Sequence, residues 1–579
     1  MSTQSQDSET IALEDLAPFQ RVLGYAVVEY ADVVDGVLRL RIWLRGAQAP
    51  EINYKLRVLT STRREVFSAT AQTHDRVLAD GRFERKALSF EIPTTSLPKG
   101  SLRLELTSLD ADETRPLRPS PGLLTSSRPR HLDGSRRYQF FPGAYLLFGR
   151  KGVKVLPRVR LRIGDINAWG RFTWGLRNFF LDLAFLLYGR KFAFARLNRF
   201  FTKRSVGEGP IWLIGERNET ARDNGVRFFE YLRREHPELR AYYIIDEDSP
   251  MLENVLPLGN VVFHSSKEHR RLMHHADVLA NAYSIKHMVP KQWNPTDYGS
   301  HFAWRIGSRR VYLKHGVHDK TTMFKRGTNG FDLVVTVGQA EGEAFETDSG
   351  YTTTQLKEVG LPRYDILVRE PGHRTVLMML TWRRYFVPKL FGVTDEVQML
   401  FEGSRYEKFL QDFFGSERLK KALENHDLNL VMVPHYNMAK EAEDIPLISD
   451  RIQVLDGATA DIPTLLRQCD LLITDYSSVH FDVGYLGTPV IYSRFDREEY
   501  QAGHASESWF SYEDDGFGPV AESVDATIDQ LLKFAEQDFE NDPQYLKRVD
   551  SIFTFRDKEN CQRLFSAIEA LETVDADVR

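Results

Sequence analysis

The chain has 579 residues, of which 42% are hydrophobic and 27% are charged, and its formal net charge is −5 at pH 7. This length exceeds what one hydrophobic core can organise and predicts roughly two to four domains, while the ordinary composition excludes disordered and fibrous proteins. Only two cysteines are present, Cys469 and Cys561. Their scarcity favours a reducing compartment and a packing role for both thiols, with a single disulfide bond as the alternative.

Residues 1–20, MSTQSQDSETIALEDLAPFQ, contain acidic residues but no apolar core of signal-peptide length. We therefore expect a disordered N-terminus and no secretion signal. No stretch of the sequence reaches the roughly 18 apolar residues that a membrane-spanning helix needs. The sequence thus predicts no transmembrane segment.

Residues 21–125 predict a small all-β, sandwich-like domain. Segments such as GVLRLRIWLRG, KALSFEIP and LRLELTSLDA alternate apolar with polar residues and are separated by Gly, Pro and Asp turns. No catalytic residue is evident in this region. Packing or protein binding is the simplest role for such a domain, and polymer binding is the alternative.

Residues 126–205 predict a basic connector. Between Arg128 and Arg204 there are 18 Lys and Arg residues against three acidic ones, so this segment carries +15 and the rest of the chain −20. Its part WGLRNFFLDLAFLLYGRKFAFARLNRFF is typical of an amphipathic helix on an anionic membrane surface. The alternative is a helix packed on the next domain with solvated arginines. Nucleic acid is disfavoured as a partner, because no RNA- or DNA-reading motif accompanies the basic residues.

Strands and helices alternate in the rest of the chain, which divides into residues 206–372 and 373–579. The first set includes IWLIGE, RAYYIID, DVLANAY and LVVTVG, and the second includes VLMMLTWR, NLVMVPHY, DLLITDYSS and PVIYS. This alternation predicts an α/β fold with two doubly wound parallel sheets side by side, a GT-B-like pair of lobes preceded by the all-β domain. The ends of strands from both lobes should face a shared cleft.

Two histidines follow apolar strands at this predicted cleft. His315 comes directly after VYLK, with Lys320 nearby, and His435 follows VMVP in the second lobe. A single histidine at a strand end is most often structural, but two on facing edges favour function. His315 is placed as a general base would be, and Lys320 can supply positive charge to a phosphate.

The stretch ITDYSSVHFDVGYLGTPVIY predicts a strand, a tight turn, a helix over residues 479–486 and another strand, with Gly487 ending the helix. Ser477 and Ser478 stand at the start of that helix. Free backbone N–H groups and two hydroxyls there make an anion site. The simplest alternative is that the serines only cap the helix.

Several catalytic signatures are missing from the sequence. It has no Walker A or GxGxxG motif after a strand and no GxSxG elbow, which argues against P-loop ATPases, dinucleotide dehydrogenases and α/β-hydrolases. It also lacks HExxH and paired cysteines, so we predict no catalytic metal and no cofactor. The remaining description fits an enzyme that transfers a group from a nucleotide diphosphate to a hydroxyl.

The motifs LKHGVHDK, VGLPRYD, LTWR, VPHY and TDYSSVHFDVGYLGTPVIYSRFDREEY, in this order, resemble the CDP-glycerol glycerophosphotransferases, the teichoic acid primases and polymerases of bacterial cell-wall synthesis. ERNETARDNGVRFFEYL resembles the opening of that family's catalytic region, and the likeness covers roughly residues 209–560. The resemblance implies a GT-B-like fold, a CDP-alditol donor bound mainly by the C-terminal lobe and a lipid-linked acceptor at the membrane.

The resemblance also implies site residues. His315 and His435 match the family's two important histidines, and Ser477 and Ser478 match serines near the donor phosphates. The family usually has an aromatic residue where Lys314 stands. Asn is usual in the family at the position of Tyr364, and both departures lie on the acceptor side of the predicted cleft. The further substrate-binding candidates in these motifs are Lys320, Arg363, Asp365, Thr381, Arg383, Thr474, Asp475 and Asp482.

We therefore predict phosphoryl-alditol transfer in teichoic acid-like or capsule polymer synthesis. His315 would take the acceptor proton, while His435, with Lys320 and Arg383, would neutralise charge on the phosphates. The expected location is peripheral, on the cytoplasmic face of the membrane. Two alternatives stay open: a GT-B glycosyltransferase that uses a nucleotide sugar, and a non-catalytic membrane-associated binding protein.

Overall fold

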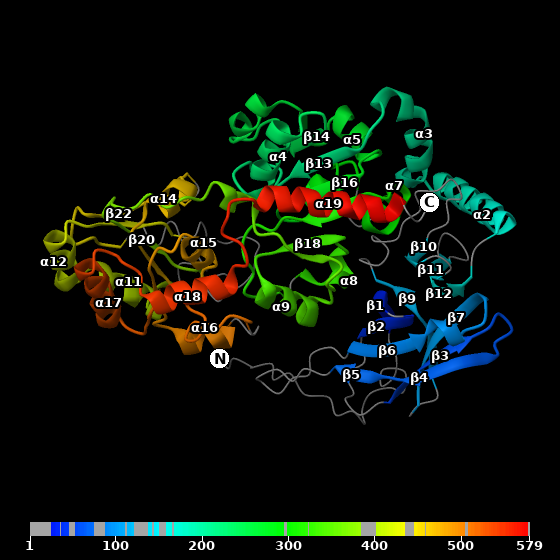
Figure 1. Ribbon diagram of the computed structural model, residues 1–579, viewed down its shortest axis with the longest axis horizontal. Coiled ribbons are helices and arrows are strands. Elements are labelled where there is room, and N and C mark those ends of the chain that lie inside the picture. Colours follow the sequence, from blue (N-terminus) through cyan, green and yellow to red (C-terminus); the bar gives the residue numbers. More distant parts are fainter. Residues whose placement is uncertain are drawn as a thin grey trace, which may run out of the picture.

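The computed structural model describes most of the chain, in fifteen ranges. They are residues 25–34, 36–45, 53–74, 87–109, 113–120, 137–141, 144–149, 158–164, 167–293, 298–321, 324–383, 401–434, 445–457, 459–503 and 508–576. The expected disordered segment 1–20 and the candidate His435 lie outside these ranges. Figure 1 shows a β domain, a central α/β lobe and a second α/β lobe on the far side of it.

The β domain is built from two antiparallel-rich sheets. The first has the order β5 (Gln72–His74), β6 (Ala87–Pro93), β2 (Val37–Arg45), β1 (Tyr25–Val34) and β9 (Arg118–Pro119). The second has the order β10 (Arg137–Phe141), β11 (Ala144–Gly149), β12 (Arg158–Ile163), β7 (Gly100–Ser108), β3 (Tyr54–Leu59) and β4 (Glu65–Thr70), with β8 (Glu113–Pro116) on β7. Alternate residues such as Leu40, Leu56 and Leu104 form its buried core.

Three strands of this domain come from the segment that the sequence predicts to be a connector. β12 pairs with β7 in the register Leu161↔Leu102, and β11 pairs with β12. Val159 and Leu161 are buried, while Arg158 and Arg160, which alternate with them, are exposed. The period of two in RVRLRI indicates a strand, a pattern that the high count of basic residues conceals.

Two helices link the β domain to the central lobe, α2 (Ala168–Leu187) and α3 (Ala195–Val206), joined by the short helix η3 (Lys191–Phe194). Phe185 and Phe192 are buried and pack into the core of the first lobe. Most of α2 lies at the right-hand edge of the molecule in Figure 1. Within the described ranges, no helix is both long and apolar enough to cross a bilayer.

The first lobe contains a seven-stranded parallel sheet. Its order is β15 (Val261–Phe263), β14 (Arg240–Ile245), β13 (Ile211–Gly215), β16 (Val278–Asn281), β17 (Arg309–Tyr312), β18 (Leu333–Thr336) and β19 (Leu356–Glu358). The helices are α4 (Asn224–Glu235), α5 (Lys267–Met273), α7 (Ala303–Ile306), α8 (Arg326–Asn329) and α9 (Gln339–Ser349). Most strand residues are buried on both faces, as expected for a parallel sheet covered by helices.

The second lobe repeats this design. Its sheet has the order β22 (Ile452–Val454), β21 (Asn429–Met432), β20 (Thr375–Met379), β23 (Leu471–Thr474), β24 (Val490–Ser493) and β25 (Val520–Ala521). Its helices are α11 (Arg405–Phe414), α12 (Glu417–Asn425), α14 (Ile462–Gln468), α15 (Val479–Tyr485), α16 (Arg497–Gly503), α17 (Val524–Glu536) and α18 (Pro543–Ile552). In both sheets the strand order reverses beside the first strand, β13 or β20, which places a ligand-binding crevice at the carboxyl ends.

Short 3₁₀ or π helices occur elsewhere. They are η2 (Thr94–Ser96), η4 (Leu252–Asn254), η5 (Leu256–Leu258), η6 (Ile285–Met288), η7 (Tyr298–Phe302) and η9 (Pro362–Asp365).

The last helix, α19 (Asn560–Ala576), returns from the second lobe to pack on the first, and Figure 1 shows it lying across that lobe. Leu564 and Ile568 are buried, and Arg309 on β17 donates to the carbonyl of Leu571 at 2.7 Å. Both cysteines are free and buried, which confirms their packing role. The predicted fold of two parallel-sheet lobes after a small β domain is also confirmed.

Candidate active site between the two lobes

Arg363 joins the two lobes at the predicted cleft. Its Nε and Nη2 donate to Asp482 on α15 at 2.6–2.8 Å, and its Nη1 donates to Asp223 at 2.7 Å and to the carbonyl of His315 at 2.6 Å. The guanidinium is therefore shared by the second lobe, the start of α4 and the turn after β17. Both Arg363 and Asp482 were predicted to bind substrate, but their hydrogen bonds to each other and to this turn indicate a positioning role.

His315 is exposed at the turn that follows β17. Its ring stacks on Tyr283, with centroids 4.8 Å apart and planes 7° apart, and meets the edge of His318 at 4.8 Å. The surrounding protein disfavours the charged ring and lowers the pKa of His315 to about 4, an effect that Asp223 partly offsets. The imidazole is consequently neutral near pH 7 and able to accept a proton.

Lys314, which precedes His315, does not face the cleft. It is buried and its ammonium group forms an ion pair with Glu341, while its carbonyl accepts from Asn224 Nδ2 at 2.8 Å. Its backbone has φ 64°, a left-handed conformation that is uncommon for a lysine. The ion pair and the carbonyl contact hold this conformation, so the departure from the family at this position is accommodated inside the lobe.

The serines of the second lobe lie next to the His315 turn. A Cβ placed on Gly316 would be 3.8 Å from both Ser478 Oγ and Arg363 Nη2. Ser478 is exposed and precedes α15, and its side chain makes no capping hydrogen bond. The simple capping interpretation is therefore wrong for Ser478, and its hydroxyl remains available to a ligand.

Lys320 lies on the first-lobe side of the same region. Its Nζ is 5.1 Å from the centroid of the Tyr500 ring, and that ring stacks on Tyr476 at 3.5 Å. No carboxylate in the described part of the chain lies within ion-pair distance of Lys320. Among the described residues, therefore, no direct ion pair neutralises the charge of Lys320. This agrees with the phosphate contact that the sequence predicts for it.

Arg383, Asp475, Thr474 and Thr381 form a supporting network beneath the site. Arg383 is fully buried, and it donates to Asp475 at 2.8 Å and to Asp496 at 2.6 and 3.0 Å. Asp475 accepts from the Thr381 N–H at 2.8 Å, and Thr474 Oγ1 donates to the carbonyl of Met379 at 2.6 Å. Arg383 was expected to neutralise phosphate charge, but its guanidinium is already paired with two carboxylates. These residues hold the strand ends in place.

Asp365 and Tyr364 also have internal roles. Asp365 accepts from the N–H groups of Asn560 and Cys561 at 2.8 and 2.9 Å and so caps α19. Tyr364 is buried and stacks on Tyr485 at 4.1 Å, between the lobes. The substrate contact of Asp365 stays a prediction, while its observed contacts are those of a helix cap. The Tyr364 departure from the family pattern serves packing.

The structure adds residues around His315 that the sequence reasoning missed. Arg217 lies over the Tyr283 ring at 4.7 Å. Glu216 is buried and accepts from the N–H groups of Asp223 and Val226 at 2.8 and 3.0 Å, and burial with the neighbouring Asp223 raises its pKa to about 7. In the sequence analysis the segment ERNETARDNG contributes only a family resemblance, although its acidic residues directly before a helix are a signal for capping.

Among the described residues, no group of three or more His, Cys, Asp or Glu side chains could hold a metal ion. The prediction of a metal-free mechanism therefore stays a prediction, and the polar groups named above are those on which a mechanism can be built.

The family model of the CDP-glycerol:poly(glycerophosphate) glycerophosphotransferases matches residues 196–570, more than half of the chain. The chain belongs to this family. The matched region contains both lobes, whereas the β domain and α2 lie outside it.

Curated members of the glycerophosphotransferase family are similar to the chain. The minor teichoic acid biosynthesis protein GgaB of Bacillus subtilis is 26% identical over 63% of this chain and 40% of its own length. The teichoic acid poly(glycerol phosphate) polymerase of the same organism is 24% identical over 54% of this chain and 42% of its own. The chain thus spans less than half the length of these relatives.

A solved structure of the wall teichoic acid polymerase TagF, soaked with CDPG, is similar in fold. It has a TM-score of 0.50 and 17% sequence identity, and the match covers 70% of this chain and 98% of that one. This likeness agrees with the two-lobed fold of the chain.

Proposed function

We propose that this chain transfers an alditol phosphate, such as glycerol phosphate, from a CDP-linked donor to a hydroxyl of a lipid-linked acceptor. The observation that carries the proposal is the exposed, neutral His315 next to Ser478 of the second lobe, within a region that matches the glycerophosphotransferase family. One lobe provides a base, and the other provides a serine hydroxyl that makes no capping hydrogen bond. This arrangement suits a donor bound between the lobes.

In the proposed reaction His315 takes the proton of the acceptor hydroxyl. The acceptor oxygen attacks the phosphorus that carries the alditol, a new P–O bond forms, and the bond to CMP breaks with its electron pair leaving on CMP. Ser477, Ser478 and Lys320 would bind the donor phosphates. His435 is proposed, from the family resemblance, to stabilise the charge on the leaving group.

Donor screening tests this proposal. The purified chain, incubated with membrane lipid extract, should release CMP from CDP-glycerol or CDP-ribitol. Release of UDP or GDP from nucleotide sugars would instead support a glycosyltransferase, and no turnover with any donor would support a binding protein.

A variant pair tests the base. His315→Ala should lower kcat at least about a hundredfold, the usual contribution of a general base. His373→Ala is the matched control, because this exposed histidine precedes β20 at the opposite end of its sheet from the carboxyl ends. Near-normal turnover in a folded His315→Ala protein would contradict the assignment.

We further propose that the chain lies peripherally on the cytoplasmic face of a membrane through α2. Its exposed apolar residues recur at helical spacing and form one stripe: Trp169, Phe172, Leu176, Phe179, Phe180, Leu183 and Leu187. Leu187 is 83% exposed and Trp169 is 70% exposed, values rare for such residues in water. Asp182, expected at the edge of this surface, is buried instead.

Co-sedimentation with vesicles tests the membrane proposal. Replacing Phe179 and Phe180 by Ser should reduce pelleting with anionic vesicles, and charge reversal at Arg190, Lys191, Arg196 and Arg199 should do the same. Turnover of a soluble acceptor analogue should be unchanged in both variants. Equal pelleting of the parent and the variants would contradict the proposal.

A further inference from the structure

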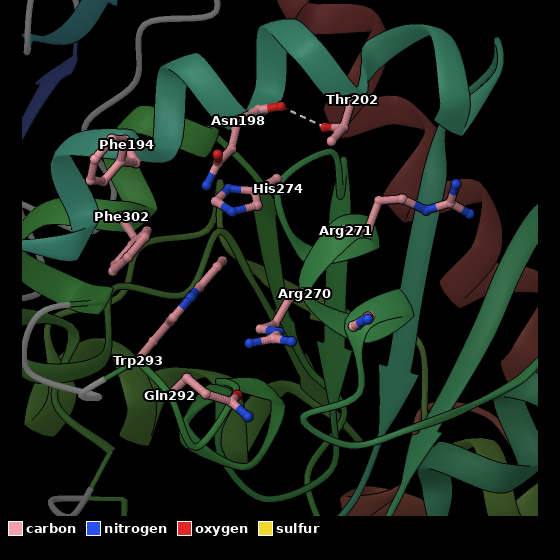
Figure 2. Close-up of a pocket in the computed structure, with 10 residues that line it drawn as sticks. Phe194, Asn198, Thr202, Arg270, Arg271, His274, Gln292, Trp293 and Phe302 are labelled. Atoms are coloured by element: carbon pink, nitrogen blue, oxygen red, sulfur yellow. Dashed lines mark hydrogen bonds between the residues drawn. The ribbon is translucent and has the colours of Figure 1, made fainter.

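A cavity lies in the first lobe, apart from the His315 site. It has a volume of about 510 Å³. Residues of α3, α5 and the turn after η6 line it, and Figure 2 shows how these side chains lie. Its lining residues of most consequence are Phe194, Asn198, Lys267, Arg270, Arg271 and Trp293. None of them contributes to the proposed transfer reaction.

One wall of the cavity is aromatic. Trp293 and Phe302 stack with centroids 4.1 Å apart and planes 6° apart, and His274 lies 4.8 Å from Trp293. These rings are buried and fixed by one another. The wall can therefore receive an apolar part of a ligand without rearrangement.

The opposite wall is basic and comes from α5. Arg271 is already used, because it donates to Glu268 at 2.6 Å and to the carbonyl of Ser205 at 3.0 Å. For Lys267 and Arg270, no acidic side chain within the described ranges lies at ion-pair distance. This wall consequently presents two positive charges without direct carboxylate partners, which suits a phosphate.

The rim of the cavity adjoins an apolar surface. Phe194, Asn198 and Thr202 follow each other at steps of four, and Figure 2 shows them on the side of α3 that faces the cavity. Phe194, Leu197 and Phe201 form the neighbouring stripe and are exposed, Phe201 by 70%. A ligand whose phosphate entered the cavity could thus lay its apolar part along α3.

We propose that this cavity binds the phosphate headgroup of an anionic membrane lipid, with the lipid chains along the exposed stripe of α3. The inference deepens the proposed membrane location and rests on it. The combination of two basic side chains, an aromatic wall and an adjoining apolar stripe favours a lipid phosphate over a free anion.

Binding of a short-chain phosphatidylglycerol, kept below its micelle concentration, tests the proposal by titration calorimetry on the full chain. We expect this lipid to bind at least about tenfold more tightly than inorganic phosphate or short-chain phosphatidylcholine. The double variant Lys267→Ala/Arg270→Ala should weaken its binding by about tenfold or more, since each charged contact contributes on the order of a tenfold factor. Arg405→Ala/Lys408→Ala on α11 removes the same charge elsewhere and should leave binding unchanged.

A second variant separates lost binding from lost folding. Asn198→Trp fills the cavity without changing its charge, and it should abolish lipid binding while the thermal transition stays near that of the parent. Unchanged lipid binding in either cavity variant, or equal affinity for inorganic phosphate, would overturn the proposal. CMP release with a soluble acceptor should persist in the double variant, so failure of the headgroup site and failure of the transfer activity give different results.

Discussion

His315 combines two properties that seldom occur in one histidine, an exposed position and a strongly lowered pKa. The surrounding protein reduces the hydration of the ring and so disfavours its charged form, as do the nearby positive charges of Arg363 and Arg217. The Arg363 contact to its carbonyl fixes the turn. Such a group stays unprotonated over most of the physiological range and remains within reach of a substrate hydroxyl.

This pKa predicts the acid limb of the rate profile. Because the free base is the active form and its pKa is about 4, kcat/KM should stay level as the pH falls from 7 to about 5 and decline only near 4. Asp223→Asn removes a carboxylate that raises this pKa, so its acid limb should move to lower pH. Steady-state CMP release with a parallel circular dichroism check measures both. A decline centred near pH 6.5 would contradict the prediction.

At the residue scale the sequence locates the site better than it assigns the roles. His315 and Ser478 are brought together as their positions after β17 and β23 predict. Arg383 follows β20 in the same way, yet it is buried against Asp496, which lies 113 residues further along the chain. A strand-end position indicates the edge of the sheet, but the direction of the side chain depends on distant partners that local pattern cannot reveal.

Among the elements, α15 and α19 show how capping is divided between local and distant residues. The predicted helix over residues 479–486 is observed as Val479–Tyr485, and Gly487 ends it with φ 74°. In contrast, the start of α19 is capped by Asp365, almost 200 residues earlier. The end of α15 at Gly487 can be predicted from the sequence. The cap of α19 by Asp365 cannot, because it depends on how the lobes pack.

The α19 cap predicts a loss of stability in Asp365→Ala. The N–H groups of Asn560 and Cys561 would lose their acceptor, which should lower the free energy of unfolding by about 1–3 kcal/mol. Asp557→Ala is the control, because this exposed residue near the same helix end forms an ion pair with the partly exposed Arg563 and accepts from the N–H of Glu559. Its loss should cost under about 1 kcal/mol. Urea unfolding monitored by circular dichroism measures the difference. Equal losses in the two variants would argue against the cap.

Three β strands lie in the segment that the sequence predicts to be a basic connector. β10, β11 and β12 extend the second sheet of the β domain to Ile163. The net charge of the whole segment indicates a basic connector and conceals these strands. The alternation within RVRLRI carried the correct signal on a shorter scale.

For the whole molecule, buried histidines predict sensitivity to acid. His269 and His480 are both buried, and burial lowers the pKa of each to about 3. The unfolded chain binds these protons near pH 6.5, whereas the folded chain does not. The two histidines therefore leave the free energy of unfolding unaffected above that pH and lower it as the pH falls below it. Each histidine should contribute a slope of up to about 1.4 kcal/mol per pH unit between 6 and 4.

The measurement is the free energy of unfolding as a function of pH. His480 Nδ1 is 2.9 Å from the hydroxyl of Tyr492, so His480→Gln keeps a polar partner for that hydroxyl and removes the titrating ring. The variant should show a smaller slope than the parent between pH 6 and 4. A slope equal to that of the parent would exclude His480 as a source of the acid sensitivity.

The return of α19 to the first lobe has a consequence for the order in which the chain folds during synthesis. Phe565 on α19 stacks on His236 at 3.8 Å and lies 5.6 Å from Trp212, the large buried ring of β13. Residues 211–372 leave the ribosome long before this helix, so their apolar surface around Trp212 stays uncovered while the entire second lobe is being made. The lobe that is translated earlier is consequently the later one to complete its core, and during that interval it is the part of the nascent chain most in need of a chaperone.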